Sequence, residues 1–180
     1  MAIQAPNTFK TSRLFLRRPR PDDALAIFEE YTQDAEVSRY TTWRPHAALS
    51  DTQAFLARCL TRWESGEEFS WVITLLSDDR AIGMITYRIK DSFKAELGYV
   101  LARRLWNQGF TSEAARAVID WALATEGTFR VHSYCDISNA ASARVMEKAG
   151  MQREGILRRW TIHPNISPEP RDCFVYSRTR

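Results

Sequence analysis

The sequence has few of the residues that hold small proteins together by covalent or metal links, and it has no long apolar run. Its three cysteines, an odd number without CxxC spacing, argue against a disulfide framework and favour free thiols in a reducing compartment. No stretch approaches the roughly 18 uninterrupted apolar residues of a membrane span. The first ten residues also lack the apolar run of a signal peptide. These absences predict a cytoplasmic protein with no membrane partner.

Glycine, proline and lysine are scarce as well. The 180 residues include 7 Gly and 7 Pro beside 44% hydrophobic and 26% charged residues, which excludes collagen-like, low-complexity and disordered chains. Only 4 of the 25 cationic residues are lysine, and the arginines are spread along the chain. The net charge of +3 therefore does not indicate a dedicated nucleic-acid binder. No linker divides the chain, so residues 1–180 are expected to form a single domain.

Alternating and helical periodicities predict an α/β (α+β) domain with the segment order β-α-α-β-β-β-α-β-α-β-β. Three successive strands form an antiparallel meander, and the strand–helix–strand unit after it should be a right-handed parallel crossover. Ser50 and Gln53 predict a capping box, Asp78-Asp79 a turn, and Lys90 to Lys94 a polar loop. The main segments are strands at 13–18, 69–75, 82–86, 95–101, 130–135 and 171–178, and helices from Pro21, from Ser50, at 111–125 and at 140–149.

The most informative stretch joins the last meander strand to the next helix. It reads Arg104-Leu105-Trp106-Asn107-Gln108-Gly109-Phe110-Thr111. Asn107 and Gly109 tolerate positive φ, so this loop can point successive backbone amides toward one spot, where the helix N-terminus adds its positive dipole end. Such an arrangement suits a pyrophosphate, although an ordinary strand-to-helix turn has the same local sequence. The Walker and GxGxxG patterns are absent.

A second stretch gives this loop its context: Asn139-x-x-Ser142, followed by Glu147-Lys148-Ala149-Gly150-Met151. Together the two stretches resemble the GCN5-related N-acetyltransferase (GNAT) superfamily, in particular the RimJ/RimL-like branch that acetylates the N-termini of ribosomal proteins. Thr11-Ser12-Arg13-Leu14, Pro21-Asp22-Asp23 and Arg171-Asp172 extend the resemblance over essentially the whole chain. The family's first loop glycine is Asn107 here, and Asn is the least costly substitute at a left-handed position.

The resemblance implies a mixed, mostly antiparallel central sheet of about seven strands, with helices on both faces and strands splayed at the cofactor site. It implies an acetyltransferase that moves the acetyl group of acetyl-CoA to a primary amine and needs no metal. The loop backbone would cradle the pyrophosphate, the preceding strand end would pair with the pantetheine arm, and Asn139 would bond that arm. The implied donor-site residues are Val100, Leu101, Arg104, Trp106, Asn107, Gln108, Gly109, Phe110, Thr111, Asn139 and Ser142.

The catalytic residues that the resemblance implies are Glu96 and Ser142. An acceptor amine must lose a proton before it attacks, because an ammonium has no lone pair. Glu96 is the leading base, because it lies on the cofactor-bearing strand and faces away from Tyr99 and the other core residues there; a solvent-facing Glu is the alternative interpretation. Ser142 would protonate the departing thiolate. Glu67 and Glu68 are reserve bases.

The other candidate side chains have simpler interpretations. Cys135 on a strand indicates buried packing rather than a nucleophile. Arg144 and Lys148 would attract the nucleotide phosphates or would form a solvated helix face. Three histidines are too scattered for a metal site: His46, His132 and His163. Core positions are expected for Trp43, Trp63, Trp71 and Trp160, although Trp43-Arg44-Pro45-His46 is also a candidate wall of an acceptor pocket.

The acceptor and the oligomeric state stay open. Protein N-termini, polyamines, amino acids and antibiotic amines all fit, because the fold fixes the donor and leaves the acceptor to loops. A non-catalytic CoA-binding or RNA-associated module is the alternative class, suggested by Asn107 and a pI of about 8.9. Nucleic acid would otherwise enter only indirectly, through the ribosome. Both a monomer and a homodimer are compatible with the sequence.

Overall fold

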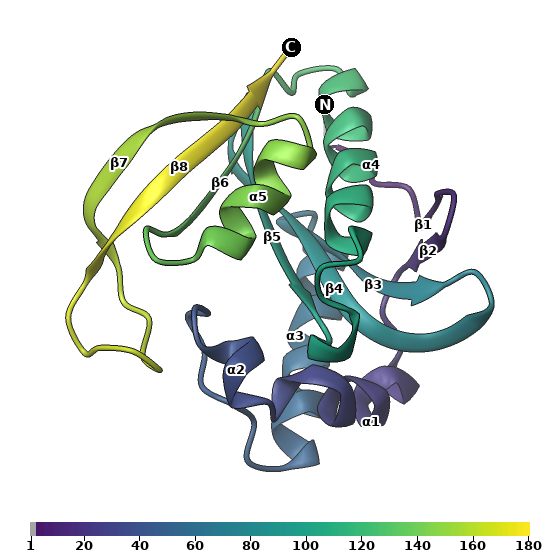
Figure 1. The fold of residues 1–180 in the computed structure, drawn as a ribbon. Helices are drawn as coiled ribbons and strands as arrows, with labels where there is room; N and C mark the ends of the chain where they lie inside the picture. Colours follow the sequence, from purple (N-terminus) through teal and green to yellow (C-terminus); the bar gives the residue numbers. More distant parts are fainter. Residues whose placement is uncertain (1–2) are drawn as a thin grey trace.

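A mixed sheet of eight strands organises the molecule, and the computed structural model describes residues 3–180 (Figure 1). Its strands are β1 (Thr8–Lys10), β2 (Leu14–Arg17), β3 (Glu68–Leu75), β4 (Asp78–Asp91), β5 (Lys94–Leu101), β6 (Arg130–Asp136), β7 (Gln152–Thr161) and β8 (Arg171–Thr179). Their order across the sheet is β1-β2-β3-β4-β5-β6-β8-β7, and only β5 and β6 pair in parallel. The predicted α+β class is confirmed, with β1 as the strand that the sequence analysis missed.

Helices cover both faces of this sheet, as predicted (Figure 1). Because side chains alternate along a strand, Val72 and Ile73 of β3 enter different apolar clusters. Val72 packs with Leu56 on one side, and Ile73 shares a cluster with Val118 on the other. The helices are α1 (Ala24–Ile27), α2 (Ala35–Ser38), α3 (Leu49–Ser65), α4 (Phe110–Ala124) and α5 (Ala140–Lys148), with short turns at Pro21–Asp23, Phe28–Thr32 and Arg103–Leu105. Within residues 3–180, no helix is both long and apolar enough to cross a bilayer.

The parallel pair β5 and β6 separates soon after it forms. Its register covers only Lys94–Glu96 against Arg130–His132, although both strands continue well beyond these residues. Where the strands part, the Ser133 hydroxyl donates to the Leu97 carbonyl at 2.7 Å. The predicted splay is therefore present, and it leaves one edge of β5 without a strand partner over its second half.

The start of α3 differs from the prediction. Ser50 and Gln53 do not form a capping box, because α3 already begins at Leu49. The Asp51 carboxylate accepts hydrogen bonds from the backbone amides of Ala47 and Ala48 at 3.0 and 3.1 Å. A charged carboxylate in the first turn also gains from the positive end of the helix dipole, so it competes successfully with a serine hydroxyl.

The two hairpin turns are shorter than predicted. Asp78-Asp79 and Lys90 belong to β4 instead of to loops, and the turns lie at residues 76–77 and 92–93. Cross-strand ion pairs hold these charged residues in the strand, since Arg17 Nε lies 2.6 Å from Asp79 Oδ1 and Lys90 Nζ lies 3.3 Å from Glu96 Oε2. The core prediction for Trp160 is also wrong: it is half exposed on β7, an edge strand, whereas Trp63 and Trp71 are buried as expected.

Candidate active site

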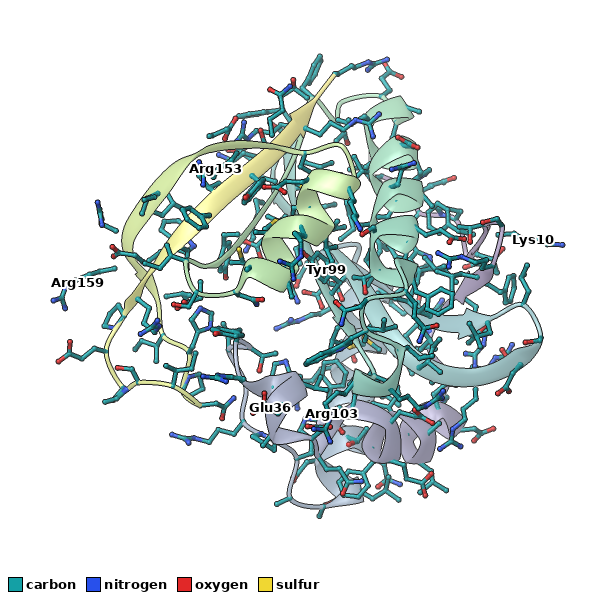
Figure 2. All side chains as sticks on the ribbon, in the orientation of Figure 1. Lys10, Glu36, Tyr99, Arg103, Arg153 and Arg159 are labelled. Carbon is teal, nitrogen blue, oxygen red and sulfur yellow. The ribbon has the colours of Figure 1, made fainter. Side chains whose placement is uncertain are left out.

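A cavity of about 630 Å³ opens where β5 and β6 part. We call one end of the cavity the donor side. It is made by the end of β5, by residues 102–112 (the loop and the start of the next helix), and by the first turn of α5. We call the other end the acceptor side, which is made by Glu68, Arg88 and Glu96 of the sheet together with segment 36–43. Figure 2 shows Tyr99 near the middle of the molecule, below α5, with Glu36 and Arg103 beneath it. Most predicted site residues line this cavity: Glu96, Val100, Leu101, Trp106, Asn107, Gly109, Phe110, Thr111, Asn139 and Ser142.

The loop before α4 has the backbone conformation that its sequence predicts. Asn107 has φ 62° and Gly109 has φ 80°, so both lie in the left-handed region. The backbone amides of residues 110–112, the first three residues of α4, donate no hydrogen bond to any group within residues 3–180. These amides and the positive end of a 15-residue helix face the donor side, which makes the loop suited to a pyrophosphate.

The N-terminal segment braces this loop from behind. The Arg13 guanidinium donates to the Gln108 carbonyl at 2.9 Å. Glu113, in the first turn of α4, accepts from the hydroxyls of Thr11 at 2.6 Å and Ser12 at 2.9 Å and from the Arg13 amide at 3.0 Å. Burial raises the pKa of Glu113, but these hydrogen bonds outweigh it and bring the pKa down to about 2. The carboxylate therefore stays charged and fixes both segments.

Arg104 and Gln108 are the two predicted donor-site residues whose side chains do not line the cavity. Arg104 Nε instead pairs with Glu30 Oε2 at 2.8 Å. The Gln108 side-chain amide turns back to the Arg104 carbonyl at 3.3 Å. Both side chains shape the loop, so any contact that they make with the donor comes from their backbone.

The end of β5 offers a free strand edge to the donor. Val100 and Leu101 pair with Met84 and Gly83 of β4 on one side, and β6 has already separated on the other. The Trp106 indole donates to the Leu101 carbonyl at 2.9 Å and so closes the strand end. An extended amide-containing chain can therefore pair with β5 near Val100.

Asn139 and Ser142 begin α5 beside this edge. Asn139 Oδ1 accepts from the Ser142 amide at 3.1 Å as the helix cap, and its side-chain NH₂ group has no acceptor in the described chain. The Ser142 hydroxyl lies 2.8 Å from the Tyr99 hydroxyl. Burial raises the pKa of Tyr99 well above its ordinary value, with the Ser142 hydrogen bond opposing this in part, so the phenol remains protonated at neutral pH. Strand alternation predicts that Tyr99 is a core residue. The ring is buried as this pattern predicts, but the pattern does not reveal that its hydroxyl reaches a polar partner.

Glu96 lies on the acceptor side in a row of charged residues that crosses four strands. The register aligns Glu68, Arg88, Glu96 and His132 on neighbouring strands. Glu96 is nearly buried, with Arg88 Nη1 at 3.4 Å and Lys90 Nζ at 3.3 Å from its two oxygens. Among the reserve bases, Glu68 also lines the cavity. Glu67 is exposed and lies outside it.

His132 adds little charge to this row. Its Nε2 lies 4.0 Å from Glu96 Oε2. Burial lowers the pKa of His132, and the nearby Glu96 carboxylate only partly opposes that effect, so the imidazole is neutral near pH 7. Its Nδ1 is buried and has no hydrogen-bond partner within residues 3–180. Arg88 and Lys90 are therefore the cations that balance Glu96.

The loop between β7 and β8 holds segment 36–43 in place over the acceptor side. The Asn165 side-chain amide donates to the carbonyls of Ser38 at 2.6 Å and Trp43 at 2.8 Å. His163 Nδ1 lies 3.4 Å from the Thr41 carbonyl. Trp43 lines the cavity, as the alternative interpretation of its segment proposed, whereas residues 44–46 do not. No local pattern in the sequence points to Asn165, because its partners are more than a hundred positions away.

The remaining candidates take subordinate places. Arg144 and Lys148 both line the cavity, at its donor side. Cys135 also lines the cavity and is buried, and burial raises the pKa of its thiol to about 12. Cys59 and Cys173 are also free and buried. Across residues 3–180, no three side chains of metal-ligating type come together.

Comparisons with known proteins agree with this geometry. Residues 13–152 match the family model described as an acetyltransferase (GNAT) domain. The uncharacterized N-acetyltransferase YoaA of Bacillus subtilis is 29% identical over 170 residues, which cover 93% of this chain and 94% of that protein. The crystal structure of a GNAT-family acetyltransferase from Bacillus anthracis is 27% identical, with a TM-score of 0.83 over 96% of this chain and 98% of that one.

RimL, a ribosomal L7/L12 alpha-N-protein acetyltransferase solved with coenzyme A, shares the fold at a TM-score of 0.83 and 17% identity, with 94% of this chain and 95% of that one covered. The family model and the relatives define an acyltransferase that uses a CoA thioester, and the splayed mixed sheet agrees with this class. The chain belongs to the acetyltransferase (GNAT) family. The predicted N-acetyltransferase class and acetyl-CoA as donor are thereby confirmed.

Proposed function

We propose that the protein transfers the acetyl group of acetyl-CoA to the N-terminal amine of a protein, with ribosomal proteins as the first candidates. The observation that supports this most is the position of Glu96 and Ser142. Both line one cavity, Glu96 on one face of β5 and Ser142 against Tyr99 on the other, so a thioester in the gap beside β5 has a carboxylate on its acceptor side and a hydroxyl on its donor side.

Donor binding uses mainly backbone groups in this proposal. The pyrophosphate lies against the amides at the start of α4, and the pantetheine arm pairs with β5 near Val100. The unpaired NH₂ group of Asn139 is available to a carbonyl of that arm. Arg144 and Lys148 attract the nucleotide phosphates from α5.

The chemical step is a direct transfer. The acceptor nitrogen attacks the thioester carbonyl carbon, a C–N bond forms, and the C–S bond breaks. The proton of the amine passes to Glu96, directly or through a water, because the attacking nitrogen needs its lone pair. Ser142 donates a proton to the leaving thiolate and regains one from solvent. The Tyr99 hydroxyl lies 2.8 Å from Ser142 Oγ and donates to the Ser142 carbonyl at 3.2 Å, so it holds Ser142 in place beside β5.

An α-amine suits this site better than an alkyl amine. Its pKa is about 7.7–8.0, against about 10.4 for a lysine side chain, so a larger fraction is already neutral near pH 7. The free cysteines fit a reducing cytoplasm, where ribosomal and other new N-termini are available.

A thiol-release assay with acetyl-CoA and a panel of amines tests the proposal, followed by a comparison of acetylated N-termini in a deletion strain and its parent. We expect release with peptides that carry a free N-terminus, and at least one N-terminus that loses acetylation in the deletion strain. Turnover of polyamines or antibiotic amines alone would assign a small-molecule acceptor. Binding of CoA without turnover of any amine, together with salt-sensitive RNA binding, would support the non-catalytic module.

A further inference from the structure

Arg88 occupies an unusual position on the acceptor side. It lies near the C-terminal end of β4, and its guanidinium crosses the neighbouring strand over Gly98. A Cβ at position 98 would come within 2.8 Å of Arg88 Nη1, so glycine is what allows this close approach. The guanidinium reaches the cavity wall in this way, and its side chain is 37% exposed there.

Two of the guanidinium nitrogens have partners, and the third has none. Arg88 Nε lies 2.5 Å from Glu68 Oε2, and Nη1 lies 3.4 Å from Glu96 Oε1. Nη2 makes no hydrogen bond or ion pair with any residue from 3 to 180. Because arginine carries five N–H donors in a planar fork, one edge of Arg88 remains open to an oxygen atom in the cavity.

The two carboxylates do not depend on Arg88 alone for their balance of charge. Glu68 also pairs with Arg62 at 3.4 Å, and Glu96 also pairs with Lys90 at 3.3 Å. A second cation is therefore present at each carboxylate. The remaining hydrogen-bond donors of Arg88 are available to a molecule bound at the acceptor side.

We propose that Arg88 binds the carbonyl oxygen next to the acceptor amine, so that the acceptor is an α-aminoacyl group and not a simple alkyl amine. In such a group the nitrogen and the oxygen lie roughly 3 Å apart. That spacing is close to the 3.4 Å between Glu96 Oε1 and Arg88 Nη1, and Nη2 is the neighbouring nitrogen of the same guanidinium, so the amine can meet Glu96 while the oxygen meets Nη2. This inference rests on the proposed function and adds to it the residue that recognises the acceptor.

Kinetics with three amines that share the same N–Cα unit test the inference. An alanyl tripeptide amide offers a carbonyl, free alanine offers a carboxylate, and isopropylamine offers neither. The quantity compared is the ratio of kcat/KM for the tripeptide to kcat/KM for isopropylamine. Differences in amine pKa cancel when this ratio is compared between the wild type and a variant.

In Arg88→Met, we expect the ratio to fall roughly 10- to 100-fold, the effect of losing a hydrogen bond to a charged group. KM for acetyl-CoA should stay unchanged. Arg88→Lys keeps a cation between Glu68 and Glu96 but lacks the open nitrogen, so it should lower the ratio as well, and it carries the test if the Met variant does not fold. Arg62→Met is the matched control: it removes the other cation from Glu68 outside the cavity and should leave the ratio unchanged.

The outcomes separate the two claims. Equal losses for tripeptide and isopropylamine in both Arg88 variants would overturn the inference and leave the proposed transfer standing. Free alanine acetylated in place of the tripeptide, with the ratio of alanine to isopropylamine dependent on Arg88, would support the inference and overturn the protein acceptor. The absence of thiol release with all three amines would overturn both.

Discussion

The donor side and the acceptor side of the cavity are built on different principles. The donor side presents mainly backbone groups from nearly contiguous chain, namely the β5 edge, the loop with Asn107 and Gly109, and the start of α4; the first turn of α5 adds the side chains of Asn139 and Ser142. The acceptor side presents charged side chains from three strands, under segment 36–43, which a distant loop holds through Asn165.

This difference explains how one fold serves many acceptors. Backbone amides and a strand edge bind any CoA thioester and tolerate most side-chain changes, provided that the backbone conformation is kept. Side chains such as Glu96 and Arg88 can be replaced without disturbing the donor. Mutations on the donor side should therefore act on acetyl-CoA binding, and those on the acceptor side on the amine and the chemical step.

The largest effect is expected from Glu96→Gln. The change keeps size and hydrogen bonding but removes the base, so kcat should fall about 10²–10⁴-fold while the affinity for acetyl-CoA is retained. The acidic limb of the pH–rate profile should also flatten. Glu67→Gln, an exposed neighbour in sequence to the reserve base Glu68, is the control and should behave like the wild type. A variant that keeps more than about a tenth of kcat would leave alignment, not proton removal, as the contribution of the enzyme.

The second-largest effect is expected from Gly109→Val, which should weaken binding of CoA at the donor side. A β-branched residue resists φ 80°, and this strain, not a clash, is the reason, because the new Cβ would meet only Arg13 at 3.5 Å. Calorimetry with CoA should show a loss of affinity of roughly tenfold or more, from about 1–2 kcal/mol of strain. Gln108→Ala, beside it, should bind almost normally. Equal affinities in the two variants would contradict the backbone account of the loop.

Asn165→Asp should affect binding of the acceptor peptide without affecting binding of acetyl-CoA. The substitution keeps the shape of the side chain but removes the NH₂ group that donates to Ser38 and Trp43, so segment 36–43 loses its anchor. We expect KM for the peptide to rise about tenfold, the scale of one or two lost hydrogen bonds, with KM for acetyl-CoA unchanged. Glu169→Gln in the same loop is the control. A parallel rise in both KM values would show a general loss of structure instead.

The last effect concerns the stability of the donor-side brace, not activity or binding. The pKa of Glu113 is about 2 in the folded protein and ordinarily 4.5, so its stabilisation is present above about pH 4.5 and is lost as the pH falls from there toward 2. Glu113→Gln should lower the free energy of unfolding by about 2 kcal/mol at pH 7 and by much less at pH 3. Denaturant melts at both pH values measure this. Glu126→Gln, at an exposed position, should change neither, and a pH-independent loss in Glu113→Gln would refute the linkage.

The sequence predicts the local backbone geometry of the donor side far better than the side-chain contacts of the acceptor side, for a physical reason. Asn107 and Gly109 are residue types that tolerate positive φ, and Asn139 is a residue type that favours a helix N-cap. Local residues therefore determine the local geometry there. Asn165 and Arg88 acquire their roles only when distant strands and loops meet. Errors at Asp51 and Asp79 have a related cause, since carboxylates in those positions found partners that no local pattern specifies.

The proposed function requires that the cavity set an N-terminal α-amine against the thioester of acetyl-CoA. A peptide with an N-terminal alanine and an internal lysine tests it most directly, after incubation with the protein and acetyl-CoA and location of the acetyl group by tandem mass spectrometry. We predict acetylation of the α-amine with the lysine unmodified in the wild type, and its loss in Glu96→Gln. Acetyl transfer to the lysine alone, or to neither amine, would contradict the claim.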